Sequence, residues 1–123
     1  MSIKYGRDSQ LVWTGRTFKT WREFSVSWGR PFKVTYFTVA AGFVTDLASI
    51  PRAVRSLIPQ VGRHLQAAVV HDWCYAGNTK LTRREADDLF YEGMTSLGVP
   101  WWKRQAMYTA VRMFGSSPWK GKT

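Results

Sequence analysis

The sequence predicts a small α+β domain, in which an N-terminal antiparallel sheet is followed by about three main helices packed together. The first third of the chain is rich in β-branched and aromatic residues, and from Asp46 on the apolar residues recur at helical spacing. The chain has 123 residues, 45% of them hydrophobic, which is enough for one core but not for two. We therefore expect a single domain, 1–123, that is β-rich at about 10–45 and helical at 46–115, with a tail at 116–123.

Two stretches carry the strand signal. Residues 11–28, LVWTGRTFKTWREFSVSW, and residues 31–45, PFKVTYFTVAAGFVT, combine β-branched and aromatic residues with partial alternation. The WGRP segment at 28–31 is typical of a turn between them. We expect a small antiparallel sheet or meander that ends near Gly42.

Proline and glycine bound the first two helical segments. A short helix is expected between Pro51, a residue favoured in the first turn, and Pro59. The first main helix is expected from about 62 to 75, with Gly77 and Asn78 as its C-terminal stop, and the tail after the last helix is expected to be extended or loose.

The other two main helices have their own start and stop signals. The segment TRRE at 82–85 is a capping-box pattern, and it opens a helix that we expect to reach about Leu97 and to end at Gly98. Pro100 begins the last helix, and Gly115 stops it.

The helix at 62–75 carries the candidate site. Ala67, His71 and Tyr75 are spaced four residues apart, so they share one stripe of the helix. Asp72 lies about 100° farther round the axis. His71 and Asp72 therefore do not face each other, but both side chains can reach one cleft at the helix edge.

The next helix carries two adjacent aspartates. Its apolar face follows helical spacing and consists of Ala86, Leu89, Phe90, Gly93, Met94 and Leu97. Asp87 lies at the flank of that face, whereas Asp88 points nearly opposite, to solvent. The linker at about 76–81 is short, so the two helices are expected to be antiparallel neighbours. This pairing would set the Asp87 carboxylate against the His71 ring.

A carboxylate next to an imidazole has a chemical use. When the carboxylate accepts from one ring nitrogen, the other nitrogen is left as a general base. Asp72 is suited to hold a hard cation such as Ca²⁺, which would stabilise a developing oxyanion. The alternative is a core histidine whose hydrogen bonds serve packing. Asp46 is likewise open to two interpretations, as a site residue or as a cap ahead of the short helix.

The segment HDWCY resembles the His-Asp-x-Cys-Tyr signature of secreted and parvoviral phospholipases A2, at His71, Asp72, Cys74 and Tyr75. The resemblance is local. It implies that the histidine activates water, that the next aspartate binds calcium, and that Asp87 in ADDLF returns to the histidine. The chain departs from those enzymes in having a single cysteine, which allows no internal disulfide, and no obvious glycine-rich calcium loop.

Four segments, in order, look like the phage and prophage family catalogued as domain of unknown function 1353: AAGFVTDLASIPR, AAVVHDWCY, ADDLF and YTAVRMFG. This second resemblance spans about 32–119 and implies a bacteriophage origin. The polar positions that match its pattern are Asp46, His71, Asp72 and Asp87.

The net charge of +10, from 18 Lys and Arg against 8 Asp and Glu, predicts an anionic partner: a lipid surface, an acidic phage protein or DNA. Other proteins of the phage particle are further partners to expect. No apolar stretch approaches the roughly 20 residues of a membrane span, so no transmembrane segment is expected. The N-terminus lacks a signal peptide, which predicts synthesis in the bacterial host cytoplasm, with incorporation into the virion as a further expectation.

The segment WWKR, which is Trp101, Trp102, Lys103 and Arg104, has two interpretations. Tryptophans beside cations are typical of residues at headgroup depth, which would make this a membrane or partner surface. Core packing is the alternative, and the one we favour. The residues that suit a buried helical face are Trp101, Trp102, Met107, Ala110, Val111 and Phe114.

We expect a phage-encoded, metal-assisted hydrolase with His71 as general base, Asp87 as its orienter, Asp72 as metal or polar anchor, and Tyr75 and Asp46 supporting the site. Esters of anionic phospholipids are the first substrate expectation, and a cell-wall substrate is the second. A structural or accessory protein of the phage tail or head-completion module is the alternative, and a nucleic-acid-binding accessory is the third. An active site predicts a His71 that solvent reaches, whereas a packing network predicts a buried one.

Overall fold

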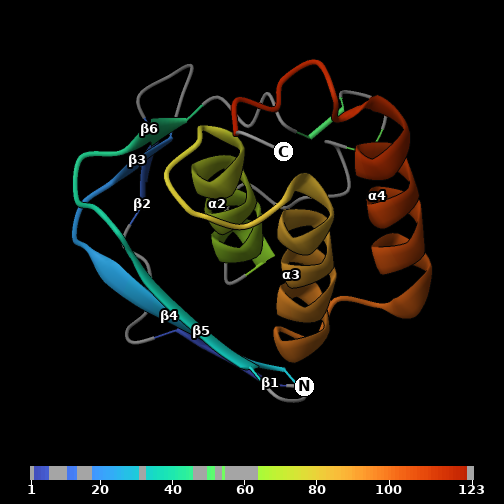
Figure 1. Cartoon of the computed structure of the whole chain (residues 1–123), viewed down its shortest axis with the longest axis horizontal. Coiled ribbons are helices and arrows are strands. Elements are labelled where there is room, and N and C mark those ends of the chain that lie inside the picture. The colour runs from blue at the N-terminus through green and yellow to red at the C-terminus, as the bar shows by residue number, and fades with distance from the viewer. Residues whose placement is uncertain are drawn as a thin grey trace. The chain divides into compact units, whose positions relative to one another are not determined.

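The structure, a computed structural model, describes residues 2–5, 11–13, 18–30, 33–45, 50–51, 54 and 64–121. The chain divides into two compact units, Met1–Asp46 and Leu47–Thr123. In the described residues, strands make up the first unit and helices the second (Figure 1). The predicted α+β class is confirmed.

Two antiparallel sheets of three strands each form the described part of the first unit. One sheet has the order β1-β4-β5, with β1 at Ser2–Tyr5, β4 at Phe24–Arg30 and β5 at Lys33–Val39. The other has the order β2-β3-β6, with β2 at Leu11–Trp13, β3 at Phe18–Thr20 and β6 at Val44–Thr45. The sequence predicts one sheet that ends near Gly42, whereas the described residues form two, and β6, which pairs with β3, lies after Gly42.

The β4–β5 hairpin has the alternation that its sequence predicts. Every second side chain of β4 is buried, namely Phe24, Val26 and Trp28, and the serines between them are half-buried. The ladder continues as far as the pair of Arg30 with Lys33. The chain therefore reverses after Arg30, and the turn predicted at 28–31 is displaced toward the C-terminus.

β1 is a strand that the sequence prediction misses. Its four residues are too few to show a period, and they form a strand by pairing antiparallel with β4, with Tyr5 opposite Val26. The partner lies far along the chain, so the local pattern does not reveal it.

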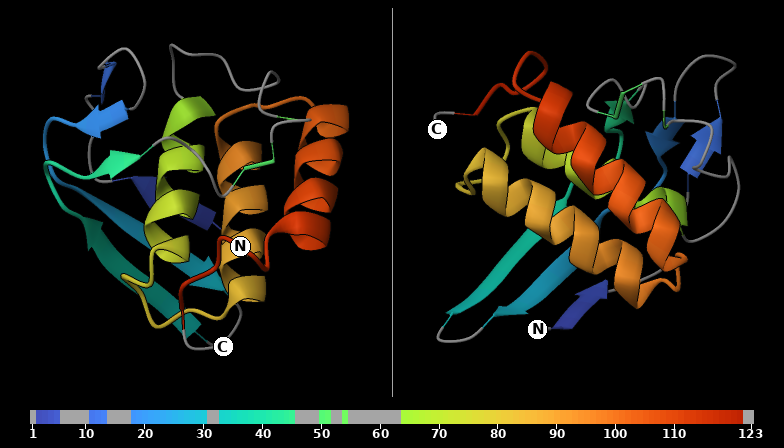
Figure 2. Two further views of the ribbon diagram at one scale, coloured as in Figure 1. Left: turned by 90° about the horizontal axis from the view of Figure 1, so that it is seen from above. Right: turned by 90° about the vertical axis from the view of Figure 1, so that its right-hand side faces the viewer.

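Three helices form most of the described part of the second unit: α2 at His64–Tyr75, α3 at Arg83–Ser96 and α4 at Trp101–Phe114. α3 packs against α2 and against α4 (Figures 1 and 2). These bounds agree with the three predicted main helices to within two residues at each end. The short helix predicted between Pro51 and Pro59 lies mostly outside the described residues.

Local signals set the helix ends as predicted. Thr82 caps α3: its Oγ1 accepts from the Glu85 backbone N–H at 3.1 Å, and the Glu85 carboxylate accepts from the Thr82 N–H at 3.0 Å. Pro100 and Gly115 are the N-cap and C-cap of α4. Gly77 follows α2 at a φ of 86°, a left-handed conformation that favours glycine.

α4 has a buried face and an exposed face. The buried face consists of Met107, Ala110 and Val111, as the packing interpretation predicts. The same interpretation is wrong for three residues that are exposed, Trp101, Trp102 and Phe114. Measured from Trp101, the buried residues lie at about 180° to 280° round the axis, well away from both tryptophans, and Phe114 is the last residue of the helix.

The sequence predicts an extended or loose tail after α4, and the structure shows two contacts between this tail and α2. The Lys120 backbone N–H donates to the Tyr75 carbonyl at 2.9 Å. Trp119 packs edge-on against the Tyr75 ring, with centroids 5.0 Å apart. The described tail is therefore hydrogen-bonded to, and packed against, the C-terminal end of α2.

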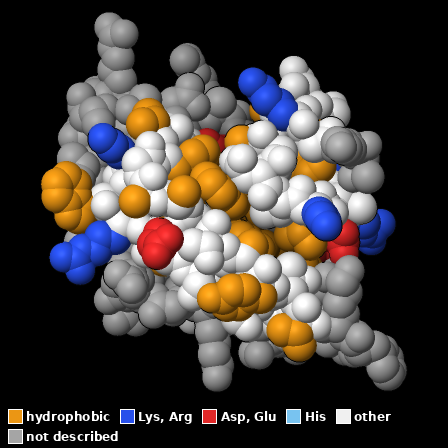
Figure 3. Space-filling model, turned by 60° about the vertical axis from the view of Figure 1, so that its left-hand side comes forward, with side chains coloured by type: hydrophobic (Ala, Val, Ile, Leu, Met, Phe, Trp, Pro, Cys, Tyr) orange, Lys and Arg blue, Asp and Glu red, His pale blue; other side chains and the backbone are white. Residues whose placement is uncertain are grey.

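No helix in the described part of the chain is long and apolar enough to span a membrane. On the face drawn in Figure 3, the Lys and Arg side chains that are described stand apart from one another. Among the described residues of that face, the positive charge is therefore spread and not gathered into one basic block.

Candidate functional site

Asp87 lies on the side of α3 that faces α2, and its side chain is fully buried. Its Oδ1 accepts hydrogen bonds from two α2 residues one helical turn apart, His71 Nε2 at 2.7 Å and Tyr75 Oη at 2.6 Å. The predicted contact of Asp87 with His71 is therefore present. Because an ionised carboxylate can only accept, Nε2 carries a proton in this contact.

α4 contributes an arginine that the sequence analysis does not single out. Arg112 Nη1 donates to the second carboxylate oxygen, Asp87 Oδ2, at 2.7 Å, and Arg83 Nη1 lies 3.8 Å from the same oxygen. The short link between α3 and α4 was a usable signal, because antiparallel neighbours set the last turn of α4 beside the first turns of α3. One carboxylate thus joins side chains from all three helices.

Asp87 keeps its charge in spite of its burial. Burial raises the pKa of this carboxyl, but hydrogen bonds from His71, Tyr75 and Arg112 together lower the pKa below its ordinary value. Partial burial lowers the pKa of the Arg112 guanidinium, but the Asp87 carboxylate raises it, and the net shift is upward. Burial and the carboxylate raise the pKa of Tyr75. At neutral pH the cluster therefore holds a carboxylate, a guanidinium and a neutral phenol.

The His71 side chain is 0% exposed. Its ring packs against Tyr75 and Phe90, with centroid separations of 4.2 and 4.6 Å. Gly115 leaves space for the Tyr75 hydroxyl, because a Cβ at this position would lie 2.5 Å from Oη. The burial of His71 matches the expectation for a packing network and differs from the exposure that an open active site predicts.

The two predicted metal ligands have different outcomes. Asp72 is half-buried on α2, and Asp46 lies outside the described residues. Among the residues that the structure describes, no group of three or more His, Cys, Asp or Glu side chains is placed to hold a metal ion. Ca²⁺ takes six to eight oxygen ligands, so Asp72 would need several partners. The calcium site stays a prediction.

The position of Asp88 opposite the apolar face predicts that its side chain points to solvent. The structure instead shows it in contact with α4. Its Oδ1 accepts from the Tyr108 hydroxyl of α4 at 2.6 Å. Burial and this carboxylate raise the pKa of Tyr108 to about 12, so the phenol stays a donor. The prediction is wrong because the pattern of one helix does not show on which side the next helix packs.

Cys74 is buried, and burial raises the pKa of its thiol to about 12. The thiolate, which is the nucleophilic form, is therefore negligible at neutral pH. Cys74 therefore serves packing and is not a candidate nucleophile.

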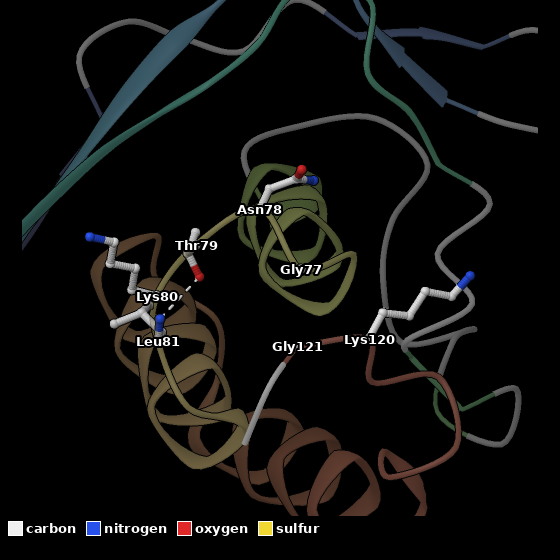
Figure 4. Close-up of a pocket in the computed structure, with 7 residues that line it drawn as sticks. All are labelled: Gly77, Asn78, Thr79, Lys80, Leu81, Lys120 and Gly121. Atoms are coloured by element: carbon white, nitrogen blue, oxygen red, sulfur yellow. Dashed lines mark hydrogen bonds between the residues drawn. The ribbon is translucent and has the colours of Figure 1, made fainter.

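A hollow of about 440 Å³ lies beside the loop that joins α2 to α3 (Figure 4). Its lining consists of Gly77, Asn78, Thr79, Lys80, Leu81, Lys120 and Gly121. The Lys80 and Lys120 side chains point away from each other, so they do not converge on one bound anion (Figure 4). None of the lining residues belongs to the Asp87 cluster, and the hollow is not where His71 would act.

Comparison with known proteins identifies the family. The family model described as "Protein of unknown function (DUF1353)" matches residues 23–111, and the chain belongs to this family. A relative named "Uncharacterized protein y4jT", from Sinorhizobium fredii (strain NBRC 101917 / NGR234), is 40% identical over 79 residues. Those residues are 63% of this chain and 23% of the relative, so the chain spans under a quarter of that protein's length. No solved structure matches the chain.

Proposed function

We propose that this member of the DUF1353 family is a hydrolase in which His71 is the general base and Asp87 is a positioning residue. One observation carries the proposal: Asp87 Oδ1 binds His71 through Nε2, at 2.7 Å. A neutral imidazole that is protonated at Nε2 has its lone pair on Nδ1, where it can accept a proton from water.

The proposed reaction is the hydrolysis of an ester. His71 Nδ1 takes a proton from water as the water oxygen attacks the carbonyl carbon. The ester C–O bond then breaks, and the proton on Nδ1 passes to the departing alkoxide, so the products are an alcohol and a carboxylic acid. Asp87 stabilises the imidazolium that forms between these steps, and Tyr75 and Arg112 hold the carboxylate in place.

Esters of anionic phospholipids are the proposed substrates, and a cell-wall ester is the next choice. The likeness of HDWCY to the phospholipase A2 signature and the net charge of +10 support this choice. The phage origin, synthesis in the host cytoplasm and a place in the virion belong to the same proposal. So does Ca²⁺ at Asp72, which when bound would stabilise the oxyanion.

A structural role in the phage particle is the second candidate, and the 0% exposure of the His71 side chain favours it. In that case the Asp87 cluster ties α2, α3 and α4 together, and the positive charge docks the domain on an acidic neighbour or on DNA. The domain would then have no reaction to catalyse, and His71 would matter for folding alone.

Fatty-acid release from phosphatidylglycerol vesicles, measured by mass spectrometry, tests the choice. The assay compares the wild type, His71→Ala and Asp87→Asn, each with Ca²⁺ and with chelator. His64→Ala is the control, because it removes the other histidine of the chain. Thermal melts of the same samples report folding.

The hydrolase predicts release that His64→Ala retains and that His71→Ala lowers by at least about 100-fold. Asp87→Asn, which keeps the size of the side chain, should also lower the rate while the protein still melts cooperatively. No release by the wild type, with a melting temperature that falls sharply in His71→Ala, would reject the hydrolase in favour of the structural role.

A further inference from the structure

α4 exposes four large apolar side chains, of which Trp102 and Met113 define what we call its outer face. Trp101 is 65% exposed, Trp102 57%, Met113 67% and Phe114 61%. The opposite face of the same helix is buried, through Met107, Ala110 and Val111. The exposed residues are therefore not left over from a poorly packed helix, since α4 already has a buried face.

Helical geometry places two of these residues, Trp102 and Met113, on one strip. Trp102 and Met113 are eleven residues apart, which places them within about 20° of the same direction and about 16 Å apart along the axis. The smaller Ala106 and Thr109 lie between them on the same strip, half-buried and exposed respectively. A strip that is apolar at both ends and runs the length of the helix suits a flat surface better than a single pocket.

The charge of α4 is entirely positive. Its sequence, WWKRQAMYTAVRMF, contains Lys103, Arg104 and Arg112 and no acidic residue. Arg112 is engaged by Asp87, and the Arg104 guanidinium lies over the Tyr91 ring at 5.4 Å. Lys103 is the cation beside the strip, with Nζ 5.5 Å from the centre of the Trp102 ring. The chain as a whole carries a net charge of +10, so the complementary partner is anionic.

We propose that the outer face of α4 docks on the surface of an anionic lipid bilayer, with the helix axis in the plane of the membrane. The tryptophans would lie at headgroup depth, the Met113 side chain at the acyl boundary, and Lys103 beside lipid phosphates. The choice of lipid over an acidic protein rests in part on the proposed function, for which this face would bring the hydrolase to its substrate.

Vesicle co-sedimentation in chelator tests the inference without turnover. The probes are vesicles of phosphatidylcholine with phosphatidylglycerol and vesicles of phosphatidylcholine alone. The variant Trp102→Ser/Met113→Ser removes both ends of the strip. Trp21→Ser is the matched control, because Trp21 is 62% exposed and belongs to the first unit. Size-exclusion chromatography with light scattering reports the oligomeric state.

The expected result is binding of the wild type and of Trp21→Ser to anionic vesicles, weaker binding to neutral ones, and a loss of about tenfold or more in the double variant. Equal binding by the double variant would overturn the assignment to α4. A wild-type dimer that the double variant dissociates, with no vesicle binding, would overturn it in favour of a second copy of the chain.

The two proposals fail separately. Vesicle binding without fatty-acid release would leave the docking face standing and reject the hydrolase. Release of fatty acid from a short-chain, monomeric ester without vesicle binding would do the reverse.

Discussion

The interface between α2 and α3 and the outer face of α4 distribute polar and apolar side chains in opposite ways. At the interface, the side chains of a histidine and a carboxylate have no exposed surface. On α4, Trp101 and Trp102 are 65% and 57% exposed. Both arrangements are unfavourable in isolation, because an unpaired buried charge costs several kcal/mol and an exposed large apolar side chain forgoes about 1.5–3 kcal/mol of burial.

The difference between the two regions lies in what offsets that cost. Asp87 receives hydrogen bonds from His71, Tyr75 and Arg112, so the chain itself compensates the buried charge. No comparable set of contacts within the described helices covers the tryptophans of α4. The buried cluster is therefore complete within the folded chain, whereas the α4 face is suited to a partner outside it.

The largest effect is expected from Asp87→Ala. Loss of the carboxylate leaves Arg112, Tyr75 and His71 without the acceptor that they share. Removing one partner of a buried charged pair lowers the free energy of unfolding by about 3–5 kcal/mol. Urea denaturation measures the free energy of unfolding. Asp88→Ala is the matched control, because it removes one partly buried hydrogen bond from Tyr108 and should cost only about 1 kcal/mol. Equal losses in the two variants would contradict the account of the Asp87 cluster.

Acid should weaken the same cluster, by less than the alanine substitution does, since protonation leaves the side chain in place. The folded pKa of Asp87 is lowered from 3.8, so its contribution is fully present above about pH 4 and is lost as the pH falls through the folded pKa. Free energies of unfolding measured from pH 6 down to pH 2 should fall more steeply for the wild type than for Asp87→Asn. Parallel curves would show that Asp87 titrates alike in the folded and unfolded chain.

Gly115→Ala tests the space beside the Tyr75 hydroxyl. The added Cβ would lie 2.5 Å from Tyr75 Oη and 2.4 Å from the Val111 carbonyl oxygen, so the end of α4 must shift. We expect a loss of about 1–3 kcal/mol in urea denaturation. Ser116→Ala, at the exposed neighbouring position, should stay within about 0.5 kcal/mol of the wild type. An unchanged Gly115→Ala would mean that the hydroxyl is not held at this place.

The smallest effect is expected on the outer face of α4. Met113→Ala should change the free energy of unfolding by no more than about 0.5 kcal/mol, because Met113 is 67% exposed. Met107→Ala, on the buried face of the same helix, should cost about 2–5 kcal/mol. The pair has the same side chain and the same helix, so similar losses would show that the outer face of α4 is packed in solution.

The helices and the Asp87–His71 contact could be predicted because their signals are local. The capping residues Thr82 and Glu85 set the start of α3, and the spacing within two helices joined by a short loop brings Asp87 to His71. The role of Arg112 needed the packing of a third helix, and β1 needed a partner strand far along the chain. The packing interpretation of Trp101 and Trp102 was wrong because apolar character alone does not show which side of a helix meets the core.

The most direct test of the central claim is the protonation state of the two His71 ring nitrogens, measured by NMR on protein labelled with ¹⁵N-histidine. His64→Ala leaves His71 as the only imidazole of the chain. Because Asp87 accepts from Nε2, the account predicts a protonated Nε2 and an unprotonated Nδ1, an arrangement that Asp87→Ala should disturb. A neutral ring protonated at Nδ1 would contradict it, since the nitrogen proposed as the base would then hold no lone pair.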